Sequence, residues 1–185
     1  MSYRRVSVSA FGAAAVSTAD MKAHLRVDHS DEDALIDAYT EAATRYVEKG
    51  TGTALRSQTW VLSLPSFPVG PVSLPGGRVT AVSSVQYLDR AGVLQTLAPA
   101  EYTLADAMVP ALIETSAVWP ATSDRADAVT ITYTVDASNE PSLLQAVRLL
   151  TSHWYENREA GADRAMELPF GVPEIINMNA AGWYG

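Results

Sequence analysis

Hydrophobic residues in the first part of the chain recur every three or four positions, which is the spacing of amphipathic helices. Ser17 or Thr18 can cap a first short helix, and Ser30 can cap a second. The apolar stripe of the second helix consists of Leu35, Tyr39, Ala42, Tyr46 and Val47. Its first turn carries the acids Asp31, Glu32 and Asp33. Gly50 and Gly52 are expected to end this helix.

The period changes between residues 56 and 136, where short β-rich segments alternate partly or well between apolar and polar residues. Residues 128–135 place large apolar side chains on one face and threonines on the other. One face of residues 79–88 is expected to carry Val79, Ala81, Ser83, Val85 and Tyr87. A tight hairpin connection is predicted at residues 89–92. Further short strands are expected at 58–64, 72–74, 93–97, 102–104 and 111–114. This pattern predicts a small antiparallel sandwich or barrel.

Another amphipathic helix is predicted near the C-terminus, with Asn139 as its cap and Pro141 in its first turn. Its wide apolar face consists of Leu143, Leu144, Val147, Leu149, Leu150 and Trp154. Such a face requires a neighbouring helix, and the second N-terminal helix is the candidate. Trp154 and Tyr155 are adjacent, so their side chains point about 100° apart. One of the two is therefore expected to face outward or toward a partner.

The order of these elements predicts an α+β fold in which a helical body encloses a β insertion. We expect one domain over residues 17–165, with helices at 17–50 and 140–160 and the β insertion at 56–136. Residues 166–185 contain scattered prolines and glycines and are expected to form an extended C-terminal tail.

The first residues, 1–16, are expected to form a flexible arm, with a short edge strand as the alternative. Two arginines followed by an apolar run have the outline of a signal peptide, but Ser7, Ser9 and Gly12 dilute the run. The arm is therefore favoured over a signal peptide.

Composition narrows the possible functions. The 185 residues are 48% hydrophobic, which supports a real core, and the net charge is −8. An acidic chain is poorly suited to gripping nucleic acid, but it suits a surface past which DNA slides. The chain contains no cysteine, which excludes disulfides, thiolate nucleophiles and cysteine metal sites. No run approaches the roughly 20 apolar residues of a membrane helix.

Candidate catalytic residues are few. His24 and His29, with nearby Asp28 and Asp31, make a small hydrolase or a zinc site conceivable, but the histidines are not spaced to share a helix face. Solvated residues in a loop are the favoured interpretation. The acids at 31–33 lack the spacing of a calcium loop, and a helix N-terminus explains them. We therefore expect no catalytic residues, no metal and no cofactor.

Several segments together resemble the head–tail connector (adaptor) proteins of long-tailed bacteriophages and gene transfer agents. They lie at residues 25–28, 31–36, 46–48, 51–55, 58–60, 67–68, 74–75, 82–85, 87–89, 154–159 and 169. The resemblance covers about residues 17–175. The stretch from residue 98 to 128 and the last ten residues carry little of it, and the segment 175–183 departs from the usual ending of the family.

The resemblance implies a structural virion protein without enzymatic activity. Its members form a ring, usually of twelve copies, that assembles in the bacterial cytoplasm. The ring binds beneath the portal protein and joins the capsid to a stopper or tail protein. It leaves a channel through which genomic DNA passes without sequence-specific binding, and no membrane is involved. A stopper or tail-completion protein of the same particle is the alternative, and the hydrolase is a weaker one.

Two sets of residues are expected to serve this role. The portal-binding set is Trp154, Tyr155, Arg158, Pro169, Phe170, Val172, Pro173, Ile175, Ile176 and Trp183. The channel-facing set is Asp31, Glu32 and Asp33.

Overall fold

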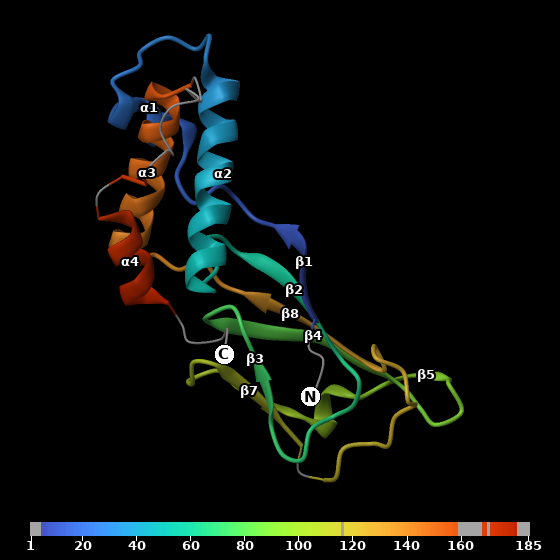
Figure 1. Ribbon diagram of the computed structural model, residues 1–185. Helices are drawn as coiled ribbons and strands as arrows, with labels where there is room; N and C mark the ends of the chain where they lie inside the picture. Colours follow the sequence, from blue (N-terminus) through green and yellow to red (C-terminus); the bar gives the residue numbers. More distant parts are fainter. Residues whose placement is uncertain (1–4, 116, 159–167, 170, 181–185) are drawn as a thin grey trace. The chain divides into compact units, whose positions relative to one another are not determined.

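The chain forms two compact units in a computed structural model that describes residues 5–115, 117–158, 168–169 and 171–180 (Figure 1). Ala13–Leu55 and Ser138–Gly185 form the helical unit, and Met1–Gly12 and Arg56–Ala137 form the β unit. The helical unit is therefore built from two segments that are far apart in the sequence. The predicted α+β fold class is confirmed.

Four helices make up the described part of the helical unit: α1 Thr18–Leu25, α2 Asp33–Thr51, α3 Pro141–Glu156 and α4 Val172–Asn179. The Ser17 hydroxyl caps α1 by accepting the backbone N–H of Asp20 at 3.1 Å, as predicted. Two predicted caps are wrong. The N-cap of α2 is Glu32 rather than Ser30, and that of α3 is Glu140 rather than Asn139. Gly50 lies inside α2, and the left-handed cap is Gly52, with φ 70°.

The buried face of α2 is rotated relative to the predicted stripe. The buried residues are Ile36, Thr40, Ala43, Thr44, Val47 and Thr51. Of the predicted stripe, Val47 is buried, whereas Ala42 and Tyr46 are exposed. The difference arises because three buried threonines satisfy their hydroxyls within the helix. Each donates to the carbonyl four residues earlier, at 2.7 to 2.8 Å. A polar residue type therefore occupies the core at no loss of hydrogen bonding.

Helix α3 packs against α2, as its apolar face predicts. Its fully buried side chains include Leu143, Val147 and Leu150. The expected extended tail is wrong for residues 172–179, which form α4 and pack against α2 and α3. Val172 is 0% exposed in the same core, with Ile175 and Ile176 partly buried beside it. Gly171, with φ 90°, turns the chain into α4, and Pro173 is tolerated in its first turn.

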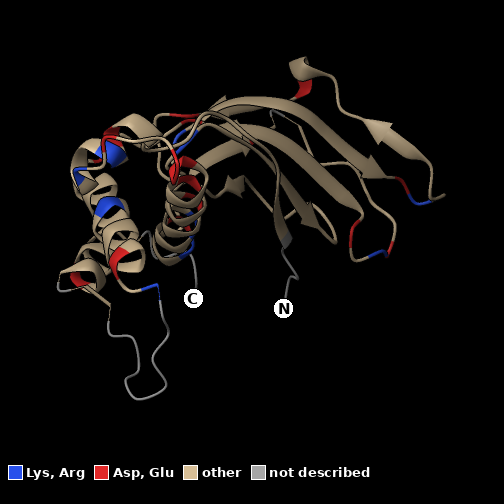
Figure 2. Cartoon of the chain, turned by 90° about the horizontal axis from the view of Figure 1, so that it is seen from above, with Lys and Arg blue, Asp and Glu red and all other residues tan. Residues whose placement is uncertain are grey.

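The β unit contains two antiparallel sheets. The larger has the order β1 (Arg5–Phe11), β2 (Gln58–Leu64), β8 (Val129–Val135), β4 (Val79–Leu88) and β5 (Leu94–Thr96). The smaller has the order β3 (Val72–Leu74), β7 (Ala111–Glu114) and β6 (Thr103–Ala105). A 3₁₀ turn, η1 (Pro99–Glu101), follows β5. Charged residues of this unit lie mostly at strand ends and connections (Figure 2).

Residues 5–11 correct the expectation of a flexible arm, because they form edge strand β1, paired with β2 from Arg5↔Ser63 to Phe11↔Gln58. The alternation of Val6, Ser7, Val8 and Ser9 is a strand signal that outweighs the flexible-arm interpretation.

The strand β4 departs from simple alternation. Val79 and Val85 are buried, but Ala81 and Ser83, which were predicted to share their face, are exposed. The pairing with β8 shifts register between Val79 and Ala81 and again between Val82 and Ser84. Each bulge inserts one residue and reverses the facing of those that follow. Val82 therefore lies opposite the fully buried Tyr133. In β8 itself the predicted alternation is confirmed.

Candidate functional site

The end of α3 is joined to the start of α2 by a three-residue cluster, here called the Glu32 clip: Glu32, Tyr155 and Arg158. The Tyr155 hydroxyl donates a hydrogen bond to Glu32 Oε2. Arg158 Nη1 lies 2.7 Å from Glu32 Oε1, so the carboxylate is held on both oxygens. The guanidinium also lies over the Tyr155 ring, 4.4 Å from its centroid, and Arg158 Nε donates to the Tyr155 carbonyl at 3.0 Å.

The clip fixes the charge of Glu32. The hydrogen bond from Arg158, followed by that from Tyr155, lowers the pKa of Glu32 from 4.5 to about 2. The same contact with Glu32 raises the pKa of the Tyr155 hydroxyl. Glu32 is therefore ionised at any physiological pH, and its charge is balanced by Arg158 rather than presented alone.

Trp154 and Tyr155 are both engaged within the helical unit. The Trp154 ring meets the Tyr46 ring edge-on, with centroids 6.4 Å apart and planes at 86°. Both residues are partly buried against the helical core. Neither ring turns fully outward, because α2 supplies Tyr46 for one ring and the N-cap residue Glu32 for the other; contact of one of them with a partner stays a prediction.

The predicted portal-binding set divides into four groups. Trp154, Tyr155 and Arg158 make the contacts with α2 and its N-cap residue described above. Val172, Ile175 and Ile176 pack into the core of their own subunit. Pro169 and Pro173 are half-buried. Phe170 and Trp183 lie outside the described residues.

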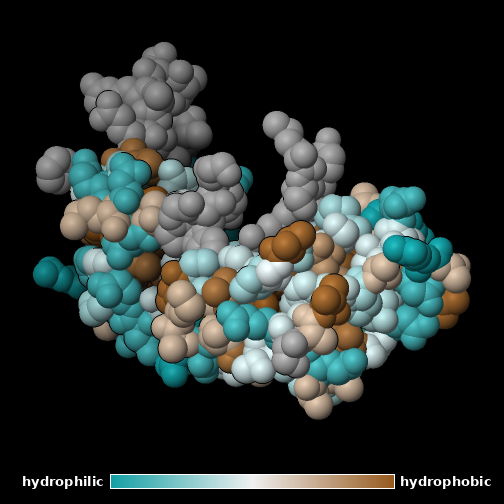
Figure 3. Space-filling model, turned by 90° about the horizontal axis from the view of Figure 1, so that it is seen from below, coloured by the Kyte–Doolittle hydropathy of each residue, from teal (hydrophilic) through white to brown (hydrophobic). Residues whose placement is uncertain are grey.

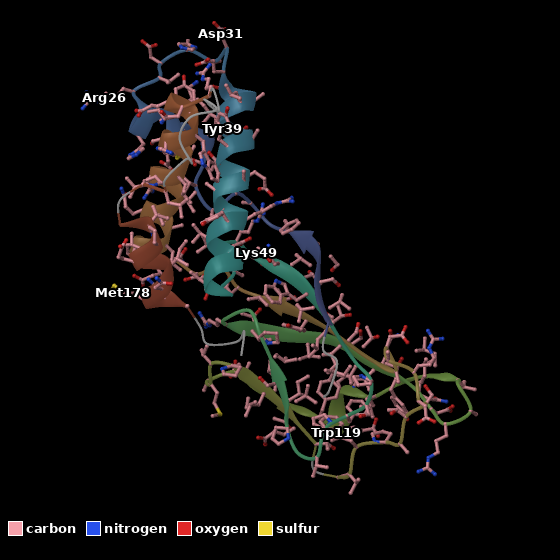
Figure 4. All side chains as sticks on the ribbon, in the orientation of Figure 1. Arg26, Asp31, Tyr39, Lys49, Trp119 and Met178 are labelled. Carbon is pink, nitrogen blue, oxygen red and sulfur yellow. The ribbon has the colours of Figure 1, made fainter. Side chains whose placement is uncertain are left out.

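Sequence reasoning missed Met178, whose side chain is 86% exposed on α4 and points away from the other helices (Figure 4). The apolar spacing of Val172, Ile175 and Ile176 would have predicted a helix with Met178 on its outer face.

The predicted channel-facing acids have different environments. Asp31 is exposed at the tip of the loop before α2 (Figure 4). Glu32 belongs to the clip. Asp33 forms an ion pair with Lys22 of α1, with Nζ to Oδ1 at 2.7 Å. Of the three, Asp31 is the one that reaches solvent without an ion pair among the described contacts.

The described residues offer little for catalysis. His24 lies in the last turn of α1 and His29 in the loop that follows. No group of three histidine or acidic residues in the described part of the chain can hold a metal ion. None of the described helices combines the length and apolar character needed to cross a bilayer.

Comparisons with known proteins point in one direction. Residues 17–87 match the model of the phage gp6-like head-tail connector proteins. A chain from the virion of a native gene transfer agent (GTA) particle is 30% identical, with a TM-score of 0.74 over 94% of this chain and 93% of that one. A chain from the neck of an empty GTA particle, computed with C6 symmetry, is 29% identical, with a TM-score of 0.74 over 94% of both chains.

A third chain, from the neck of a native GTA particle computed with C12 symmetry, is 29% identical, with a TM-score of 0.70 over 93% of both chains. No curated protein matches the chain.

Proposed function

The chain belongs to the family of phage gp6-like head–tail connector proteins, and on this premise we propose that it forms an adaptor ring beneath the portal of a phage or gene transfer agent particle. The ring joins the DNA-filled capsid to a stopper or tail protein and leaves a channel for DNA. One observation carries the proposal: similarity to neck chains extends over 94% of the molecule and includes both units. The role is structural, and it requires no catalytic group.

Twelve copies are proposed for the ring. The support is that similar chains occur in necks computed with C6 and with C12 symmetry, and twelve copies are compatible with both. A closed ring requires heterologous contacts, in which one surface of each copy meets a different surface of the next.

We propose that the portal-binding surface lies at the C-terminal segment, from the end of α3 through α4. The side chains that pack inward, including Val172 and Ile176, hold α4 on its own subunit. Its outer face, which carries the exposed Met178, is left for the portal. Exposed methionine suits such a contact because its flexible side chain adapts to an apolar surface.

The DNA channel is proposed to run past the acidic loop before α2. Asp31 is exposed there, and the whole chain has a net charge of −8. Carboxylates repel phosphates, so DNA moves past them without being held. Glu32 and Asp33 contribute less because Arg158 and Lys22 offset their charges.

The test is binding of the purified full chain to a purified portal ring. Met178→Lys places a charge on the proposed surface while remaining compatible with the C-terminal end of a helix. We expect it to weaken portal binding about tenfold, a loss of about 1.4 kcal/mol. The matched control is Met108→Lys, since Met108 is also exposed, at 54%, but lies in the β unit.

Equal binding by the two variants and the native chain would show that α4 is not the portal surface. Failure of the native chain to bind any portal ring, or to reach a ring mass on it, would overturn the adaptor function itself.

A further inference from the structure

A hollow of about 590 Å³ opens on the surface of the β unit. Residues 66–71 form one wall, and residues 114–122, apart from the undescribed residue 116, form the other. Its lining is mostly apolar and includes Phe67, Val69, Val118, Trp119 and Pro120. Val69 and Val118 are 110% and 92% exposed, so two aliphatic side chains stand in solvent at its rim. Hydrophobic side chains reach the surface in several patches in the view from below (Figure 3).

The hollow is held rigid without a partner. Phe67 and Trp119 stack, with centroids 4.6 Å apart and planes within 4°. The Trp119 indole N–H donates to the Gly70 carbonyl at 2.8 Å and ties the two walls together. Phe67 also meets the Tyr87 ring of β4 edge-on at 5.9 Å. Trp119 is labelled in Figure 4. A surface that is already ordered loses little conformational entropy when a partner binds to it. Exposed apolar side chains that gather on such a surface are typical of an interaction site.

The hairpin between β4 and β5 is a second rigid apolar feature of the same unit. The Asp89 carboxylate accepts hydrogen bonds from the backbone N–H of Ala91 and Val93 and from the Gln95 amide, at 2.9 to 3.0 Å. These bonds lower the pKa of Asp89, and the bond from Gln95 contributes most. The negative charge of Asp89 therefore stabilises the turn from within. The tip nevertheless exposes Val93 at 54% and Leu94 at 60%, beside the exposed Arg90.

We propose that the hairpin tip of one copy inserts into the Phe67–Trp119 hollow of the next copy. None of the hairpin residues lines the hollow in its own chain. Charge supports the pairing, because Glu114 is the one charged residue among the described lining residues and Arg90 is the cation at the tip. Valine and leucine side chains suit an apolar hollow, and the two rigid surfaces need no rearrangement to meet.

We propose that each copy gives its hairpin tip to one neighbour and receives the tip of the other neighbour in its hollow, which makes the contact heterologous. Such a contact, repeated around an axis with a rotation that closes, builds a ring; a reciprocal exchange of tips would instead give a two-fold dimer, and the double-cysteine chain would then stop at a dimer instead of forming a ladder. The inference therefore rests on the proposed adaptor ring and names the contact that joins its subunits. The C-terminal segment takes no part in it, so the ring contact and portal binding can be tested separately.

The absence of cysteine from the sequence allows a direct test by disulfide trapping. Full-length chains carrying Val93→Cys are mixed with full-length chains carrying Val118→Cys, alone and with the portal ring, and then oxidised. A disulfide forms only when the two Cα atoms come within about 7 Å. We expect a cross-linked dimer on mixing, and a ladder of higher oligomers from a chain carrying both substitutions. Met108→Cys is the matched control, since Met108 and Val93 are each 54% exposed, and it should not cross-link to Val118→Cys.

A charge-reversal cycle gives a second readout. Arg90→Glu and Glu114→Arg should each weaken self-association about tenfold, and the double variant should restore most of it, because the pair is re-formed with reversed sign. No cross-link despite a ring mass would overturn this contact and leave the adaptor ring standing. Self-linking of Val93→Cys chains as strong as the mixed link would overturn the heterologous geometry. Neither cross-link nor ring mass would overturn both the contact and the ring.

Discussion

The substitution Gly50→Ala tests how α4 is held on the helical unit. A Cβ at position 50 would lie 2.8 Å from Ile176 Cγ2, well inside the ordinary carbon–carbon contact of about 3.5–4.0 Å. The Ile176 side chain is β-branched and stiff within α4, so relief requires the helix itself to move. The missing side chain of Gly50 is therefore what lets α4 approach α2.

Two opposing effects determine how much Gly50→Ala changes the free energy of unfolding. Alanine inside a helix is favoured over glycine by roughly 0.5–1 kcal/mol. Overpacking of this kind costs typically 1–3 kcal/mol. The clash outweighs the helix preference, so we expect Gly50→Ala to lower the free energy of unfolding by about 1 kcal/mol. Hydrogen exchange of the α4 amides should accelerate more than that of α3.

A double-mutant cycle with Ile176→Ala isolates the contact. Ile176→Ala alone should cost about 1–2 kcal/mol, since the side chain is only half-buried. It also removes Cγ2, so the double variant should lose about 1–2 kcal/mol less than the sum of the single losses. The assay is urea unfolding followed by far-UV circular dichroism. Ala38→Gly, at an exposed position of α2, measures the helix preference by itself. Additive losses within about 0.5 kcal/mol would refute close packing of α4 on Gly50.

Three further predictions concern the clip and the two cores. Glu32→Gln should lower the Tm above pH 4.5. Because the folded pKa of Glu32 is lowered to about 2, the difference from the native chain should shrink as the pH falls from 4.5 toward 2, and a constant difference would contradict the clip. Ile131→Ala, in the fully buried row of β8, should lower the free energy of unfolding by about 2–5 kcal/mol in urea titrations. Thr44→Val should change that energy by less than about 1.5 kcal/mol, because its hydroxyl donates to the Thr40 carbonyl of its own helix, which the helix already satisfies; a larger loss would reveal a further partner.

The sequence predicts the buried residues correctly in elements where burial alone determines the hydrophobic pattern. In β8 every second residue is buried, so alternation alone placed Ile131 and Tyr133 in the core. The stripe of α2 was misplaced because hydropathy treats threonine as polar, whereas a helix satisfies the hydroxyl of Thr44 internally. The prediction of which β4 side chains share a face was wrong because of the two bulges. A bulge depends on the pairing with the partner strand and cannot be recognised from the residue types of β4 alone.

The candidate site was harder to predict, since its residues are distant in sequence. Glu32 and Tyr155 are 123 positions apart, and no local pattern joins them. The acids before α2 and the aromatic residues at the end of α3 each stand out in the sequence, but their contact with each other follows only from the packing of α2 against α3. Met178 escapes prediction because Pro169, Gly171 and Pro173 favour an extended tail over a helix in this segment.

The clip gives Tyr155 and Arg158, which lie in one of the segments that resemble the family, a role inside the subunit. Tyr155 and Arg158 hold Glu32 at the N-cap of α2, and Glu32 directly follows the exposed Asp31. Arg158 directly follows the end of α3, where the proposed portal-binding segment begins. The acidic loop and the start of the proposed portal-binding segment are therefore fixed to each other through one carboxylate. If the portal grips the C-terminal segment, it also sets the position of Asp31. Loss of the clip should then leave portal affinity nearly unchanged while loosening the acidic loop, and faster hydrogen exchange at residues 27–32 in Glu32→Gln rings on the portal would measure that loosening.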